Sequence, residues 1–226
     1  MRFITAFLFA LLLAAASAWA LPLANREALQ GPTTFYVSPT GSDTTGDGLT
    51  LATAWRTPRF AVFEVQRKYD FNCFQPTIKL AAGTYSAVSV EYYGPAVGCQ
   101  VSGGGPLILT GDCAAGAGAV VLNGTSGVNV VSMDGNASIV VTCLTLNAPG
   151  AAALYATNGA IIEAGSVIFG AASTHAMADA DGSVFLTGSY TIAGNAVYHG
   201  HANMGGTLVV LSGVNVTINP GLNISQ

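Results

Sequence analysis

The sequence predicts an all-β protein whose chain coils as a parallel β-helix. The first observation is an internal repeat between Ser138 and Asn219, in which four pairs of short apolar runs start 22, 23 and 24 residues apart. A period of this size is typical of solenoids, in which each repeat buries its apolar face against its neighbours. The second observation is that the runs are rich in β-branched residues and show no helical spacing, which favours strands.

Each repeat divides into three short strands joined by corners rich in Gly, Asn and Asp, residue types that tolerate the positive φ of a sharp turn. The first strands are expected at Ser138–Val141, Ala160–Glu163, Ser183–Leu186 and Thr207–Val210. The second are expected at Leu144–Asn147, Val167–Gly170, Tyr190–Ala193 and Val216–Asn219, and the third at Val130–Ser132, Leu154–Ala156, Ala176–Ala178 and Ala196–Tyr198. Three strands in ~22 residues describe one turn of a coil whose strands stack at about 4.8 Å.

The alternation within the strands predicts which side chains face the interior. The second strands give two buried ladders: Leu144, Val167, Tyr190 and Val216, and Leu146, Phe169, Ile192 and Ile218. In the first strands, an inward Ile161 would bring the charge of Glu163 into the core without a partner, which is costly. We therefore expect Ile162, Phe185 and Val209 to point inward.

The N-terminus has the features of a secretory signal peptide over residues 1–20. Arg2 supplies the positive charge, an apolar stretch follows, and Ala18-Trp19-Ala20 matches the small-residue cleavage pattern. The apolar stretch is shorter than the ~20 residues that a membrane-spanning helix needs. We expect a secreted, periplasmic or cell-surface protein that is free of the membrane after cleavage.

Four regions are predicted along the chain. They are the signal peptide (1–20), a flexible lead-in (21–34), an N-terminal strand with a capping helix (35–76), and a parallel β-helix of about six turns (77–226). Thr57-Pro58 is an N-cap followed by proline at the first helical position, which predicts a short helix over Phe60–Tyr69. A helix there would cover the open end of the core.

Three segments resemble the opening of pectin-lyase-like right-handed parallel β-helix proteins, which are secreted or similar to phage tail spikes. They are the motif YVSPTGSDTTGDG from Tyr36, IKLAAGTY at Ile78–Tyr85 and GPLILTGD at Gly105–Asp112. The resemblance implies the fold class: a right-handed, single-stranded parallel β-helix with a short N-terminal capping helix. Because one fold supports many activities, the resemblance does not assign one.

Composition excludes some partners. Only 8% of residues are charged and the net charge is −4. Every Lys or Arg lies at or before Lys79, so the later chain lacks the basic surface by which proteins bind nucleic acid. No cofactor is predicted. The loop Gly41–Gly48 offers Asp43 and Asp47 as calcium ligands, but two carboxylates are a sparse set, and an ordinary Asx/Gly turn is the alternative.

The four cysteines of an exported chain favour disulfides over free thiols. Cys73 and Cys99 each precede a strand in successive turns, and Cys113 and Cys143 each follow one. We expect the bridges Cys73–Cys99 and Cys113–Cys143. No pair of cysteines has the short spacing of a zinc site.

One polar group of residues is a candidate site: His175, Asp179, Asp181, His199 and His201. Asp179 and Asp181 are two residues apart, as are His199 and His201, so each pair would share a face of an extended strand. Paired carboxylates about 6.5–9.5 Å apart serve inverting glycosidases, and histidines can shuttle protons. The alternative is that Asp181 forms a corner while Asp179 and the histidines are surface decoration. His175, Tyr155 and Tyr198 are candidate binding residues.

The resemblance does not supply a catalytic set. Pectate lyases need a basic residue that residues 80–226 lack, and Asp179-Ala-Asp181 and Tyr198-His-Gly-His201 do not match the polygalacturonase motifs. The main hypothesis is an exported, non-catalytic module that binds polysaccharide or builds a surface or fibre structure, with self-association end to end or side by side. The alternatives are a polysaccharide-degrading enzyme, a hydrolase rather than a lyase, or a fragment of one.

Overall fold

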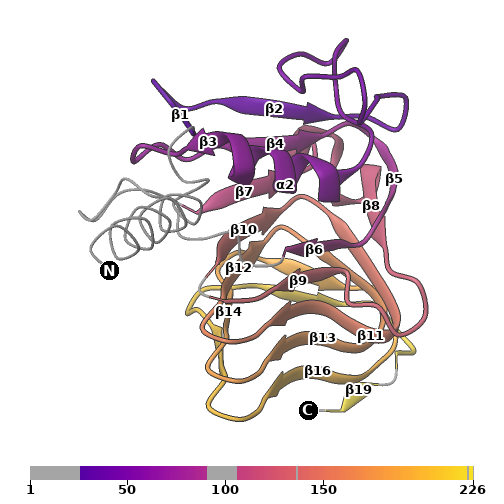
Figure 1. The fold of residues 1–226 in the computed structure, drawn as a ribbon. Helices are drawn as coiled ribbons and strands as arrows, with labels where there is room; N and C mark the ends of the chain where they lie inside the picture. The colour runs from indigo at the N-terminus through magenta and orange to yellow at the C-terminus, as the bar shows by residue number, and fades with distance from the viewer. Residues whose placement is uncertain (1–25, 91–105, 136, 223, 226) are drawn as a thin grey trace, which may run out of the picture.

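The computed structural model describes residues 26–90, 106–135, 137–222 and 224–225, and these ranges are mostly β-strand (Figure 1). Their one α-helix is α2 (Pro58–Lys68), and η2 (Cys113–Ala115) and η3 (Ala117–Ala119) are short 3₁₀ turns. The helix expected at Phe60–Tyr69 is therefore present, but it begins two residues earlier and ends one residue earlier. Thr57 is its N-cap, with Oγ1 accepting a hydrogen bond from the Phe60 amide, and Pro58 is at the first helical position.

The strands pair in parallel and form three columns, and the chain passes through the columns in turn. We call one strand from each column a rung. The first column is a seven-stranded sheet of β2 (Thr34–Val37), β4 (Thr77–Leu80), β7 (Leu107–Thr110), β10 (Ser138–Thr142), β12 (Ile161–Gly165), β14 (Ser183–Leu186) and β17 (Thr207–Val210). The second contains β5 (Gly83–Ser86), β8 (Val120–Asn123), the starts of β11 (Thr145–Ala156) and β13 (Ile168–Ala178), β15 (Tyr190–Ile192) and β18 (Val216–Ile218). The third contains β6 (Val88–Val90), β9 (Val131–Met133), the ends of β11 and β13, β16 (Ala196–Ala202) and β19 (Ile224–Ser225).

The register of the first column corrects one predicted alignment. Ser138 pairs with Ile161, which pairs with Ser183, so the second repeat starts one residue later than Ala160. Because side chains alternate along a strand, a slip of one residue reverses inside and outside. Ile162 is buried as expected, but Val184 and Leu186 are inside in place of Phe185, and Leu208 packs against the core in place of Val209.

The two ladders of the second column are present. Leu146, Phe169, Ile192 and Ile218 lie in successive strands in register, as do Tyr190 and Val216. All the predicted members are buried except the last of each ladder, Val216 and Ile218, which lie in the last rung of the described ranges and are exposed.

The third column differs from expectation in two ways. In two rungs the second and third strands are continuous, since β11 and β13 bend at register irregularities instead of ending at a corner. In the last of the four repeats, Ala176 and Met177 pair with Gly200 and His201, so the matching segment is Gly200–Ala202 and not Ala196–Tyr198. The longer β16 shifts the aligned residues by four positions.

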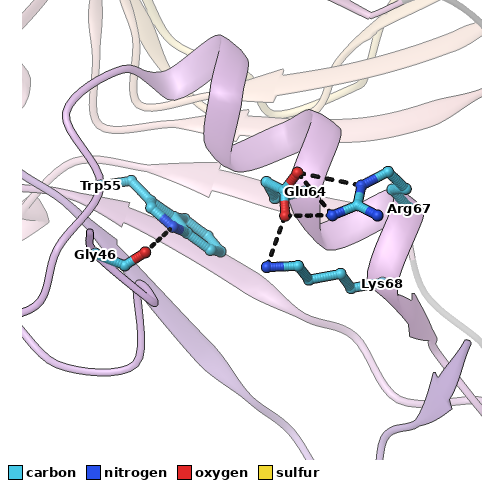
Figure 2. A network of polar contacts seen from close by, with 5 residues as sticks. All are labelled: Gly46, Trp55, Glu64, Arg67 and Lys68. Atoms are coloured by element: carbon cyan, nitrogen blue, oxygen red, sulfur yellow. Dashed lines mark hydrogen bonds and ion pairs between the residues drawn. The ribbon is translucent and has the colours of Figure 1, made fainter. Parts of the chain in front are cut away.

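The N-terminal end is covered by α2 and a loop. Pro58, Ala61, Val62 and Val65 are buried, and Trp55 stacks on Phe35 with ring centroids 5.7 Å apart. Figure 2 shows the Trp55 Nε1 group, which donates to the Gly46 carbonyl at a distance of 3.0 Å, and the contacts of the buried Glu64 with Arg67 and Lys68. Glu64 accepts hydrogen bonds from Arg67 and forms an ion pair with Lys68 at 2.7 Å.

Burial raises the pKa of Glu64, but the hydrogen bonds and charges of Arg67 and Lys68 outweigh burial and lower it overall. The buried carboxylate is therefore kept ionised by its own helix.

Residues 26–34 of the predicted lead-in lie within the described ranges, where they contact the rest of the fold. β1 (Glu27–Ala28) pairs with β3 (Tyr69–Asp70), and Leu29 is buried in the core, so an apolar contact and a strand ladder hold residues 26–34. The predicted signal peptide, residues 1–20, lies outside the described residues. Among those described, no helix is long and apolar enough to cross a membrane.

One of the two predicted disulfides is confirmed. Cys113 is bonded to Cys143, with Cα atoms 5.0 Å apart and a sequence separation of 30. The other prediction, Cys73–Cys99, involves Cys99, which lies outside the described residues. The confirmed bridge is typical of proteins that fold in an oxidising environment.

Candidate functional site

His175, His199 and Tyr190 form a chain of hydrogen bonds that crosses three strands. His175 Nε2 lies 3.0 Å from the Gly170 carbonyl oxygen, and its Nδ1 lies 3.1 Å from His199 Nδ1. His199 Nε2 lies 2.8 Å from the Tyr190 hydroxyl. His175 follows the bend of β13, His199 is its neighbour in β16, and Tyr190 begins β15.

The Gly170 carbonyl oxygen determines which atom donates in each of these hydrogen bonds. A carbonyl oxygen only accepts, so His175 must donate from Nε2, which leaves its Nδ1 as an acceptor in the neutral ring. His199 therefore donates from Nδ1, and its Nε2 accepts from the Tyr190 hydroxyl. All three side chains are neutral in this arrangement, and each polar atom has a partner.

The surroundings favour these neutral forms. His175 has no exposed surface and stacks on Phe169, with ring centroids 5.2 Å apart. Burial, aided by the neighbouring His199 and opposed by the bond to Gly170, lowers the pKa of His175 to about 4. Burial also lowers the pKa of His199 and raises the pKa of Tyr190.

Asp179, Tyr155 and His201 lie on a different surface, the outer face of the third column. Tyr155 pairs with Met177, and Met177 pairs with His201, so these three side chains follow one another along the stack. The Tyr155 hydroxyl donates to Asp179 Oδ2 at 3.3 Å, and the rings of Tyr198 and His201 are 5.3 Å apart. We call Tyr155, Met177, Asp179, Tyr198 and His201 the aromatic face.

Asp181 is at a corner and does not join Asp179. Ala180 and Asp181 have positive φ, 43° and 62°, so the chain is not extended there and the two carboxylates do not share a strand face. Asp181 is exposed, and its amide donates to the Met204 carbonyl of the next rung at 3.2 Å. The predicted group is thus divided into a buried histidine pair, an aromatic face with one carboxylate, and a corner.

A groove of about 300 Å³ lies beside the second column. Short uncharged side chains line it, including those of Ser166, Ser189, Thr191, Asn215 and Thr217. These side chains offer hydroxyl and amide groups to a ligand but no titratable group at neutral pH.

The loop with Asp43 and Asp47 uses both carboxylates internally. Asp43 accepts from the amides of Arg56 and Thr57 and from the Thr57 hydroxyl, which ties the loop to the start of α2. Asp47 accepts from the Leu49 amide and the Thr53 hydroxyl. No group of three or more His, Cys, Asp or Glu side chains suited to a metal occurs in the described ranges.

The pattern of the second strands predicts that Tyr190 lies in the core, but it does not predict the contact of its hydroxyl with His199. A tyrosine within an otherwise aliphatic ladder needs a partner for its hydroxyl, and the histidines one strand away were the available candidates. That need was the signal for the contact.

Comparisons with protein-family models, with curated proteins and with solved structures found no match to this chain.

Proposed function

We propose that the chain is a right-handed, single-stranded parallel β-helix that acts outside the cell as a non-catalytic module binding neutral polysaccharide. The three columns of parallel strands support the coil, and the resemblance to pectin-lyase-like proteins supports its hand and class. The predicted signal peptide and the Cys113–Cys143 bridge support export.

The observation that carries the proposal is the aromatic face. Tyr155, Met177 and His201 lie in successive rungs, so the face extends along the stack, as a linear polymer would. Tyr198 is 41% exposed, and an exposed ring offers an apolar surface to the C–H groups of a sugar. Asp179, beside Tyr155, offers a carboxylate that accepts hydrogen bonds from sugar hydroxyls.

Charge selects a neutral glycan over an acidic one. From Leu80 to Gln226 the chain has six acids (Glu91, Asp112, Asp134, Glu163, Asp179 and Asp181) and no Lys or Arg. A polyuronate is negatively charged, so the negative field of this region would repel it.

The alternative of a polysaccharide hydrolase draws little support from the positions of the candidate acids. Such an enzyme needs two carboxylates placed on either side of one bond. Asp181 belongs to a corner, and no second acid lies with Asp179 on the aromatic face. The buried His175 has no surface to offer a substrate.

Affinity electrophoresis tests the proposal directly. The mature chain is run through gels containing a mixed-linkage glucan, a xylan, a galactomannan or polygalacturonate. We expect at least one neutral polymer to retard it and polygalacturonate to have no effect. Tyr155→Ala and Tyr198→Ala each remove a ring from the face and should weaken binding by about tenfold, the equivalent of ~1.4 kcal/mol.

Tyr36→Ala is the matched control, because Tyr36 is a half-buried tyrosine at the other end of the molecule. It should bind as the unmodified chain does. If no neutral polymer retards the chain, or if all three variants are retarded equally, the aromatic face is not a polysaccharide-binding site. Release of reducing sugar that Asp179→Asn abolishes would establish the hydrolase instead.

A further inference from the structure

The strand β16 carries residues of the aromatic face and also one ring of the buried histidine pair. Tyr198 and His201 belong to the aromatic face, with ring centroids 5.3 Å apart. His199, between them in sequence, contacts the interior residues His175 and Tyr190. β16 pairs in parallel with β13, and Figure 1 shows the two strands side by side. The positions of two face residues and the geometry of the histidine pair therefore depend on the same strand.

His199 ties β16 to the interior of the stack. Its ring centroid lies 5.7 Å from that of Phe169 and 5.3 Å from those of both His175 and Tyr190. Its Nδ1 lies 3.1 Å from His175 Nδ1, and its Nε2 lies 2.8 Å from the Tyr190 hydroxyl. A change in these contacts would therefore act directly on β16.

The histidine pair accommodates one added proton but not two. A proton on His199 Nε2 leaves the bond from His199 Nδ1 to His175 Nδ1 in place, and the Tyr190 hydroxyl turns so that its oxygen accepts. A second proton, on His175 Nδ1, places an N–H on both of the nitrogens that lie 3.1 Å apart. Neither nitrogen then accepts, and both rings are cations, so the contact becomes repulsive.

The groups around the pair do not offset two positive charges. The bend of β13 presents the Gly170 carbonyl, β15 presents the Tyr190 hydroxyl, and Phe169 packs against both rings. In the part of the chain that the structure describes, no carboxylate forms a hydrogen bond with either ring. The titratable groups further along β13 and β16, Asp179 and His201, contact tyrosines of the aromatic face instead.

We propose that the histidine pair is an acid-sensitive switch for the aromatic face. While at most one of the two rings is charged, the pair holds β16 beside β13, and His201 stays in register with Met177. When both rings are charged they separate, β16 moves away from β13, and a bound polysaccharide is released. The identity of the ligand rests on the proposed function, whereas the movement of β16 can be tested without any ligand.

Hydrogen exchange of the mature chain at pH 7 and pH 4, followed by mass spectrometry, tests the movement. After correction for the intrinsic pH dependence of exchange, we expect the amides of β16 to lose protection at pH 4. The amides of β14, in the first column, should keep theirs. Equal protection of β16 at the two pH values would overturn the proposal. So would an equal loss in β14, since acid would then loosen the whole stack.

Calorimetric titration with a neutral polymer that retards the chain tests the release, because such a polymer has no group that titrates between these pH values. From pH 7 to pH 4 we expect the dissociation constant to rise about tenfold, as for the loss of the Tyr198 ring. His175→Gln removes the switch, because the Gln amide can donate to the Gly170 carbonyl and accept from His199 Nδ1 without titrating. This variant should bind equally at both pH values.

His201→Gln is the matched control, since it removes an exposed histidine of the face and leaves the buried pair in place. Its binding should still weaken about tenfold between pH 7 and pH 4. If His175→Gln keeps the pH dependence, or if His201→Gln loses it, an exposed group is responsible and the switch is overturned. Circular dichroism at both pH values checks that the variants fold. If no neutral polymer binds, or if His175→Gln does not fold, the hydrogen exchange of the unmodified chain still decides whether the switch exists.

Discussion

His175 is a titratable ring with no exposed surface, in a chain whose core is otherwise almost entirely aliphatic and aromatic. It is stable there because the Gly170 carbonyl and His199 satisfy both ring nitrogens while the ring stays neutral. A protonated His175 would turn both nitrogens into donors, so that Nδ1 would face the N–H of His199. His199 must then move its proton from Nδ1 to Nε2, or the two rings must separate.

The pH dependence of stability follows from this arrangement. The pKa of His175 is lowered from 6.5 to about 4, so below pH 6.5 the unfolded chain binds a proton that the folded chain does not. The stability that the neutral His175 provides is fully present above pH 6.5 and is lost as the pH falls toward 4. Between pH 7.5 and 5, the free energy of unfolding should fall by about 2 kcal/mol from His175 alone. Urea unfolding at the two pH values measures this change.

Two variants identify the histidine that is responsible. Gln can donate to the Gly170 carbonyl but does not titrate, so His175→Gln should make the urea midpoint less dependent on pH. His201→Gln alters an exposed histidine and should keep the full dependence. An unchanged dependence in His175→Gln would show that the buried ring is not the cause.

The sequence predicted part of this site. The 24-residue separation of His175 and His199 is close to the repeat period, which is typical of neighbouring positions in adjacent rungs, and the two residues are neighbours in β13 and β16. The positions of Asp179, Asp181 and His175 relative to one another depend on a turn and a strand bend, which the sequence pattern does not indicate. Positive φ at Ala180 turns Asp181 away from Asp179, and the bend in β13 buries His175 although Met177, two residues on, faces outward.

At the scale of the strand, prediction depended on alignment to within one residue. Glu163 faces outward, as the cost of burying its charge predicts, and pairs there with Val140 and Phe185. Phe185 is outside and not inside because the repeat begins at Ile161, whereas the predicted alignment begins at Ala160. The repeats vary from 22 to 24 residues because the corners between strands tolerate an added or missing residue. The repeat length alone therefore does not determine which residues of neighbouring strands pair.

The glycines at the corners between strands mark positions where the stacked strands should be least tolerant of substitution. A Cβ on Gly182 would collide with the Ala156 carbonyl of the preceding rung, and one on Gly206 with that of Ala178. Gly182→Ala should therefore destabilise the fold by roughly 2–3 kcal/mol, since backbone must move to admit it. Gly118 has no atom within 4 Å of such a Cβ, so Gly118→Ala should change stability by less than about 0.5 kcal/mol. Equal urea midpoints for the two variants would contradict the close packing of rungs at the corner.

The disulfide links neighbouring elements, since Cys113 is in η2 and Cys143 follows β10. Replacing both cysteines with serine opens a loop of 30 residues and should lower the free energy of unfolding by about 3 kcal/mol. Thermal unfolding of the unmodified chain with and without reductant gives the comparison. If neither the serine substitutions nor the reductant lowers the unfolding temperature, the bridge does not stabilise the fold by restricting the unfolded chain.

For the molecule as a whole, the sequence predicted the all-β class, the repeat and the helix near the N-terminus because these rest on patterns that extend over many residues. The continuous β11 and β13 and the pairing of β1 with β3 were not predicted, because neither follows from a repeated sequence pattern. Each rung touches mainly the next one, so local errors of this kind do not spread through a stacked architecture.

The helix α2 also determines which edge of the stack is closed to other chains. It contacts β2 and β4, the first strands of the first column, and a covered strand edge cannot template a strand from another copy. In polymer terms, α2 therefore acts as a chain stopper at this end. Its removal is the alteration that we expect to open β2 to strand addition by another copy.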